Sequence, residues 1–243
     1  MLVASALNHQ DRRAAIRATW GGGAALVFLL GAAPAPNPAL ERELAEEVEQ
    51  HGDILRSDFL DTYRNLTLKT VAGMKWGARH CPQAEFVLKT DDDMYVNLPL
   101  LETHLLSQYA GQTKLITGCV KNGPQGAPQP VAAAGPGGPG LPFPTVHPLF
   151  TAGAGYVVSG DLVEQLYTAS LDTPLVRVED AYLTGYCARR VSGVRKVHNS
   201  RFSCGELVQR DCLMVESFTG HKVPPDRMFA IHSKLAVGEC EAR

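Results

Sequence analysis

Short apolar runs alternate with amphipathic stretches along the first third of the chain. The apolar runs predict buried strands at residues 2–7, 24–30 and 85–90, and residues 53–56 predict a further short strand. Between them, helical spacing of apolar positions predicts helices at residues 11–20, 38–51 and 60–80, the last ended by Cys81-Pro82. Strands and helices are therefore expected to alternate.

The helix predicted over residues 38–51 has clear signals at both ends. Asn37 suits the capping of free backbone amides, Pro38 has no amide to leave free, and Gly52 stops the pattern. Leu40, Leu44 and Val48 recur at helical spacing and define an apolar face. The acidic residues between them predict a solvated face: Glu41, Glu43, Glu46, Glu47 and Glu49.

Alternating strands and helices predict an α/β fold with a largely parallel central sheet covered by helices on both faces. In such sheets, ligands bind beyond the carboxyl ends of the strands. We expect residues 1–243 to form a single domain. Within it, residues 123–144 contain six glycines and seven prolines, a low-complexity composition that predicts a loop and no core element.

Composition narrows the possible partners. With 45% hydrophobic and 20% charged residues and a formal net charge of −2, the chain has an ordinary globular composition and no positive field to recruit nucleic acid. The longest apolar run, residues 24–33, is too short to span a bilayer.

The cysteines and one sequon point to an oxidising compartment. The six cysteines include no CxxC pair, which favours disulfides over structural zinc, although the sequence does not choose among the 15 possible connectivities. Asn65-Leu66-Thr67 is a sequon, so Asn65 is a candidate glycosylation site.

Three consecutive aspartates follow the strand predicted at residues 85–90. If the extended backbone continues, Asp91 and Asp93 point to one side and Asp92 to the other. Two carboxylates on one face form a hard oxygen site suited to Mg²⁺ or Mn²⁺ with room for phosphate oxygens. The alternative interpretation is a solvated acidic turn.

A second acidic pair, Glu179-Asp180, precedes a helix predicted over residues 181–188. Such a pair is common at helix N-termini, but a partly buried carboxylate there also has the chemistry of a general base. Between the acidic stretches, Gly153 and Gly155 would let the backbone approach a ligand closely. The alternative for the glycines is a loop and a tight strand entry.

Three separated stretches together resemble a known family. "RRAAIRATWG", "FLDTYRNLTLKT" with "FVLKTDDDMYVN", and "GAGYVVSGDL" with "EDAYLTGYC" are similar to motifs of the β-1,3-galactosyltransferases and β-1,3-N-acetylglucosaminyltransferases. The motifs occur in the family's order over residues 2–118 and 149–232. The resemblance implies an inverting Golgi enzyme of the GT-A type with a Rossmann-like nucleotide-sugar-binding half.

The resemblance also implies roles for individual residues. Asp91 and Asp93 would bind Mn²⁺ (or Mg²⁺) and through it the diphosphate of UDP-galactose or UDP-N-acetylglucosamine, with Asp92 supporting them. Asp180, beside Glu179, would be the base that deprotonates a 3-hydroxyl of a glycan acceptor on protein or lipid. Arg13 or Arg17 would pair with the phosphates. His221 would be a ligand of the metal ion or a phosphate contact, and His232 is a weaker candidate.

Some features depart from the family pattern. Its members carry an N-terminal membrane anchor and stem, which this sequence does not display, and residues 123–144 lack the tryptophan expected among the acceptor-site residues. Phe150 and Thr151 replace an aromatic residue and a cysteine. Two alternatives therefore stand beside the transferase: a catalytically degenerate nucleotide-sugar- or glycan-binding member, and a metal-dependent phosphohydrolase.

Overall fold

The central element of the fold is a seven-stranded, mostly parallel sheet. A computed structural model describes residues 1–121 and 147–240, so the loop predicted over residues 123–144 lies outside the described residues. The strand order is β3-β2-β1-β4-β7-β6-β8, and β7 alone runs antiparallel to its neighbours. The strands are β1 (Leu2–Ala4), β2 (Val27–Ala32), β3 (Ile54–Leu60), β4 (Phe86–Asp91), β6 (Leu115–Lys121), β7 (Phe150–Ser159) and β8 (Arg195–His198).

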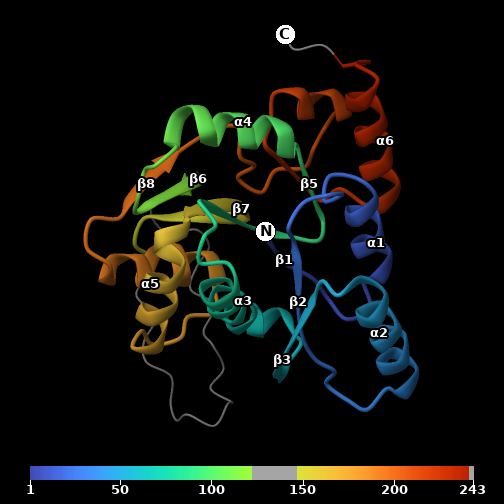
Figure 1. Ribbon diagram of the computed structural model, residues 1–243, viewed down its shortest axis with the longest axis horizontal. Coiled ribbons are helices and arrows are strands. Elements are labelled where there is room, and N and C mark those ends of the chain that lie inside the picture. Colours follow the sequence, from blue (N-terminus) through green and yellow to red (C-terminus); the bar gives the residue numbers. More distant parts are fainter. Residues whose placement is uncertain (122–146, 241–243) are drawn as a thin grey trace.

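Helices cover both faces of this sheet (Figure 1). One buried cluster joins the sheet to α1 (Gln10–Ala18), α2 (Pro38–His51), α4 (Leu98–Tyr109) and α6 (Pro225–Ala236). A second cluster joins the opposite face to α3 (Leu66–His80), α5 (Gly160–Leu171) and a π-helical turn, Ala181–Cys187. Shorter 3-10 helices lie at Tyr63–Asn65, Ala188–Arg190 and Asp211–Val215. The predicted α/β fold class is confirmed.

Alternation along single strands explains how both faces become apolar. In β4, Leu88 packs into the α1 cluster whereas Val87 packs into the α3 cluster. In β1, Val3 likewise packs into the α1 cluster and Leu2 into the α3 cluster. Because successive strand side chains point to opposite faces, a continuous apolar run builds two cores at once.

The residues predicted to begin and end α2 do so in the structure. The side chain of Asn37 accepts a hydrogen bond from the amide of Leu40, Pro38 occupies the first turn, and Gly52 has a φ of 64°. A left-handed residue of this kind ends a helix without a Cβ clash. The prediction of a solvated acidic face is wrong at one position, because Glu47 is only 2% exposed.

The helix predicted over residues 60–80 begins later than expected. Strand β3 continues to Leu60, and the amide of Asp61 still donates to the carbonyl of Ala32 in β2. The Asp61 carboxylate also accepts from the amide of Gly31. Pairing with β2 thus overrides the local helical pattern, and α3 starts only at Leu66.

The topology brings several loops to one edge of the sheet. Strands β1, β4, β6 and β8 run in the same direction, so their carboxyl ends meet there, together with the start of antiparallel β7. Beyond this edge, β5 (Met94–Val96) pairs with β9 (Thr219–His221) in a small second sheet. This is the edge at which parallel α/β sheets bind ligands.

Two disulfides cross-link the C-terminal half of the chain. Cys119 of β6 is bonded to Cys204, and Cys212 to Cys240, whereas Cys81 and Cys187 carry free thiols. The disulfides that the sequence favoured are therefore present. In the described part of the chain, each helix is too short or too polar to cross a bilayer.

Candidate active site at the carboxyl edge of the sheet

The three aspartates form a turn, and the extended continuation predicted for them is wrong. Strand β4 ends at Asp91, residues 92–93 turn, and β5 begins at Met94. The side chains of the three aspartates have different partners. Asp91 contacts Lys89, whereas an Asp93 oxygen lies 3.7 Å from Nε2 of His221. Burial, aided by the charges of Asp91 and Asp92, raises the pKa of Asp93.

Asp92 fixes the loop that follows β1. It is 5% exposed and accepts hydrogen bonds from the Ser5 hydroxyl at 2.7 Å and the Ala6 amide at 3.3 Å. One of its oxygens lies 2.8 Å from Nδ1 of His9, and the other accepts from Arg12 at 3.1 Å. Asp92 therefore anchors the β1–α1 connection beside the aspartate turn, and its support of Asp91 and Asp93 stays a prediction.

The structure does not agree with a phosphate contact by Arg13. Its guanidinium is 0% exposed and donates five hydrogen bonds: two to Glu47, one each to the carbonyls of Ala6 and Leu7, and one to the Ser5 hydroxyl. Five is the full donor capacity of arginine. Arg13 therefore supports the loop from behind and has no donor left for a ligand.

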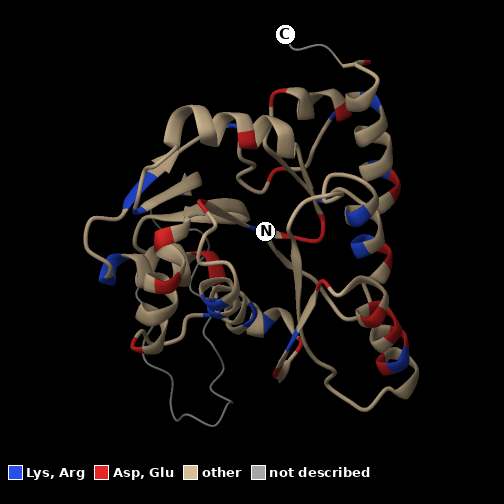
Figure 2. Ribbon diagram, viewed as in Figure 1, with Lys and Arg blue, Asp and Glu red and all other residues tan. Residues whose placement is uncertain are grey.

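Arg17 is likewise engaged within the protein. It donates to Glu47 at 2.8 Å and makes two hydrogen bonds of 2.8 Å to Asp53. Figure 2 shows the basic segments of α1 beside the acidic segments of α2. The motif "RRAAIRATW" thus uses its second and third arginines to join α1 to α2.

Glu179 is buried and held by two partners. It is 4% exposed, and its carboxylate accepts from Lys89 at 2.8 Å and from the hydroxyl of Tyr156 at 2.9 Å. Burial raises the pKa of Glu179, opposed by the Lys89 charge. For Lys89 itself, burial alone would lower the pKa, but Asp91 and Glu179 together raise it, so the lysine is an ammonium ion.

Asp180 lies beside the start of β7. Its carboxylate accepts hydrogen bonds from the amides of Gly153, at 2.8 Å, and Ala181, at 2.9 Å. Burial raises the pKa of Asp180 although both amides favour the charged form. A carboxylate in this setting is a stronger base than an exposed aspartate, which suits proton abstraction from a hydroxyl group.

The two glycines approach protein side chains. A Cβ added to Gly153 would lie 3.3 Å from the Asp180 carboxylate. Gly155 has a φ of 138°, and a Cβ there would lie 3.0 Å from Thr219. Glycine at these positions thus lets β7 pack closely against Asp180 and β9, and close backbone approach to a ligand stays a prediction.

The remaining predicted residues have different surroundings. Nδ1 of His221 lies 2.9 Å from the carbonyl of Gly205, which turns Nε2 toward Asp93. His232 contacts the hydroxyl of Tyr95 at 3.2 Å. Asn65 donates to the carbonyl of Leu60, and the Thr67 hydroxyl of the sequon is buried, so glycosylation of Asn65 stays a prediction.

Sequence reasoning missed two charged residues at this edge. Lys89 lies inside an apolar strand, where its two-residue spacing from Asp91 was the available signal, since both then share one face. Arg12 is 31% exposed and makes one hydrogen bond, to Asp92, among the described residues. It therefore keeps N–H groups for a ligand, unlike Arg13.

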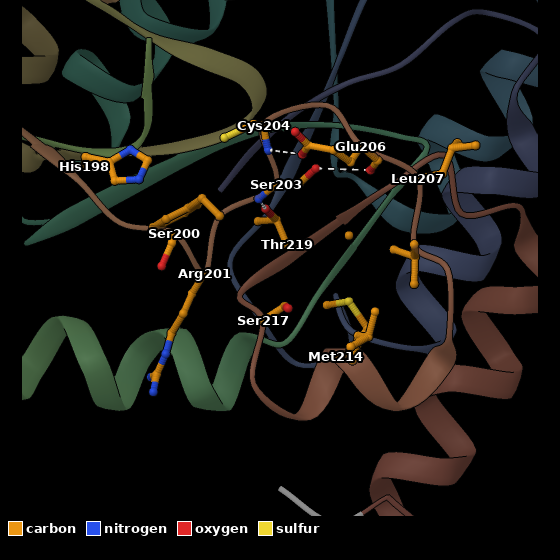
Figure 3. Close-up of a pocket in the computed structure, with 14 residues that line it drawn as sticks. His198, Ser200, Arg201, Ser203, Cys204, Glu206, Leu207, Met214, Ser217 and Thr219 are labelled. Atoms are coloured by element: carbon orange, nitrogen blue, oxygen red, sulfur yellow. Dashed lines mark hydrogen bonds between the residues drawn. The ribbon is translucent and has the colours of Figure 1, made fainter. Parts of the chain in front are cut away.

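A pocket of about 330 Å³, lined by both polar and apolar side chains, opens next to β9 (Figure 3). Figure 3 shows Ser203, Glu206 and Thr219 close together at one wall, where the Ser203 amide donates to the Thr219 hydroxyl at 2.9 Å. Ser200 and Ser217 add further hydroxyl groups. Because Thr219 also packs against Gly155, the pocket adjoins the strand that holds Asp180.

The donor set at the aspartate turn suits a hard cation only in part. Asp91 and Asp93 are 30% and 27% exposed, so both carboxylates face solvent, and His221 supplies a nitrogen. However, residues 1–121 and 147–240 contain no group of three His, Cys, Asp or Glu side chains arranged to hold a metal ion. An ion at this turn would need ligands from a bound molecule or water.

Comparisons with known proteins agree with the motifs. The family model for galactosyltransferases matches residues 11–200. Human beta-1,3-galactosyltransferase 5 is 37% identical over 234 residues, covering 93% of this chain and 74% of that protein. Mouse beta-1,3-galactosyltransferase 1 is 34% identical over 244 residues, covering 97% and 73%.

Among solved structures, a glycosyltransferase involved in glycosylation of the major capsid of PBCV-1 has a TM-score of 0.46 and 16% identity. It covers 96% of this chain and 98% of its own.

Proposed function

Since this chain belongs to the galactosyltransferase family, we propose that it transfers galactose from UDP-galactose to a 3-hydroxyl of a glycan acceptor, forming a β-1,3 linkage with inversion. The family relationship confirms the resemblance seen in the motifs. The observation that carries the proposal is the meeting of Asp91, Asp93 and Asp180 at the carboxyl edge of one sheet. In this proposal, residues nearly 90 positions apart form one site.

We place the donor diphosphate at the aspartate turn. Arg12 is the cation with donors available there, and His9 lies beside it on the loop held by Asp92. Guanidinium groups recognise phosphate oxygens through paired N–H groups. Asp93 and Asp91, with His221 beside them, would hold Mn²⁺ or Mg²⁺, with diphosphate oxygens completing the ligands. The bound ion would neutralise charge on the leaving diphosphate.

Asp180 acts as the general base in this proposal. Its carboxylate takes the proton of the acceptor 3-hydroxyl while that oxygen bonds to the anomeric carbon and the bond to UDP breaks on the opposite face. The two amides of Gly153 and Ala181 fix the orientation of the carboxylate. General base catalysis of this kind contributes roughly 10²–10⁴-fold.

We place the acceptor on the β8 side of Asp180, toward the pocket of Figure 3. The donor-side groups lie on the other side, at the end of β1. Hydroxyl-lined walls offer the exchangeable donors and acceptors that sugar hydroxyls need. The two disulfides support placement of the chain in an oxidising compartment such as the Golgi lumen.

Calorimetry and a transfer assay together test this function. The purified chain should bind UDP only with Mn²⁺ or Mg²⁺ present, and Asp93→Asn should abolish that binding without unfolding the protein. Asp180→Asn should keep UDP binding and lose galactosyl transfer. UDP binding without transfer by the parent protein would favour the degenerate, non-catalytic alternative, and absence of metal-dependent UDP binding would overturn the donor site.

A further inference from the structure

A fully buried lysine lies between the two halves of the proposed site. Lys89 is 0% exposed, and its ammonium donates to Asp91 at 2.9 Å, to Glu179 at 2.8 Å and to the carbonyl of Gly153 at 3.4 Å. An ammonium has three donors, so each finds an acceptor. The three acceptors come from the aspartate turn, the acidic pair and β7.

The arrangement connects Asp91 to Asp180 through a short chain of contacts. Gly153 accepts from Lys89 through its carbonyl and donates to Asp180 through its amide. Glu179, the neighbour of Asp180, is fixed on one oxygen by Lys89 and on the other by Tyr156. A shift of the lysine would therefore be transmitted to both Asp91 and Asp180.

The buried ion pair between Lys89 and Glu179 is costly to desolvate. Replacing buried ion pairs with well-packed apolar groups is often neutral or stabilising, so the charge at Lys89 is poorly explained by stability alone. Asp91 remains 30% exposed, so the carboxylate that Lys89 orients still faces solvent at the turn. The geometry suits a lysine whose role is to position the carboxylates of Asp91 and Glu179.

We propose that Lys89 is a positioning residue that holds two parts of the proposed site at a fixed separation. These parts are Asp91 at the aspartate turn, where the donor would bind, and the Glu179–Asp180 pair, which contains the proposed base. This inference rests on the proposed function. Lys89 does not touch either substrate; it acts through Asp91, and through Glu179 and Gly153 on Asp180. Misplacement of reacting groups by about 1 Å costs on the order of 10²-fold in rate.

The test compares Lys89→Met, Glu179→Gln and the double variant with the parent protein. Lys89→Met leaves the buried Glu179 carboxylate and the partly exposed Asp91 carboxylate without their cation, and is expected to lower the thermal midpoint. In the double variant Glu179 is neutral as well, so much of this loss should be recovered. Lys75→Met, at an exposed lysine of α3, is the matched control.

Two functional readouts separate positioning from folding. In the double variant we expect affinity for UDP with Mn²⁺ to stay about tenfold below that of Glu179→Gln, and kcat with UDP-galactose to stay about 10²-fold below that of Glu179→Gln. Recovery of both values to those of Glu179→Gln would mean that Lys89 has a structural role only, and would overturn the inference. A parent protein that binds no UDP with Mn²⁺ would instead overturn the proposed function, and this inference with it.

Discussion

Arg13 donates two hydrogen bonds to the carboxylate of Glu47, at 2.9 and 2.6 Å, in a pair with almost no exposed surface. The pair joins α1 to α2 directly behind the β1–α1 connection. It explains why two arginines of a motif that resembles a donor-binding sequence are structural. It also explains why a glutamate on an apparently solvated face is buried.

Loss of this pair should destabilise the protein strongly. Glu47→Ala leaves Arg13 buried without a counter-charge, and we expect a loss of about 3–5 kcal/mol in the free energy of unfolding. Urea denaturation measures the change. Glu46→Ala, at an exposed position of the same helix, is the control and should change stability little. Equal stability of the two variants would contradict the structural role of Arg13.

Arg12 should contribute directly to donor binding. Arg12→Gln removes a charged donor at the aspartate turn, and we expect UDP affinity in the presence of Mn²⁺ to fall roughly 10- to 100-fold. Titration calorimetry gives the affinity, with Arg42→Gln on the exposed face of α2 as the control. Unchanged affinity in Arg12→Gln would remove this residue from the donor site.

The acid limb of the pH profile should report Asp180. Burial raises the pKa of Asp180 above its ordinary value of 3.8. The base must be ionised, so kcat/KM should be full above the raised pKa and fall as the pH drops through it, at higher pH than an ordinary aspartate allows. UDP affinity over the same pH range separates this loss from donor release. If kcat/KM instead fell only at the pH expected for an exposed aspartate, Asp180 would be excluded as the titrating base.

The two disulfides should differ in their contribution to stability. Cys119–Cys204 closes a sequence separation of 85 residues and Cys212–Cys240 one of 28. Loop-closure entropy then predicts that replacing the first pair by alanine costs about 1 kcal/mol more than replacing the second. Chemical denaturation of the two double variants measures the difference. A larger loss from the shorter loop would show that native-state effects dominate.

Filling the pocket beside β9 should weaken acceptor binding and leave donor binding unchanged. Ser200 is exposed at the pocket rim, so Ser200→Trp adds bulk without disturbing the core. We expect the KM for a glycan acceptor to rise about tenfold while UDP affinity stays at the parent value. Ser192→Trp, at an exposed position before β8, is the control. An unchanged acceptor KM would place the acceptor outside this pocket.

Local sequence patterns determined most elements and the main acidic stretches. Hydrophobic periodicity and the Asn37, Pro38 and Gly52 signals predict α2 correctly, because strand or helix type and helix ends depend on nearby residues. The same patterns placed three aspartates at the end of β4 and Glu179-Asp180 farther along the chain, which is enough to predict an active-site edge in an α/β fold.

The tertiary structure decided which of these residues are available for chemistry. Hydrogen bonds between Lys89 and Glu179, 90 residues apart, and between Arg13 and Glu47, 34 residues apart, depend on strand order and helix packing. Pairing of β5 with β9 turned Asp93 toward His221. Periodicity assigns a side chain to a face, but only the assembled sheet determines which distant charge meets it there, and that contact decides whether an arginine or aspartate binds a ligand or supports the fold.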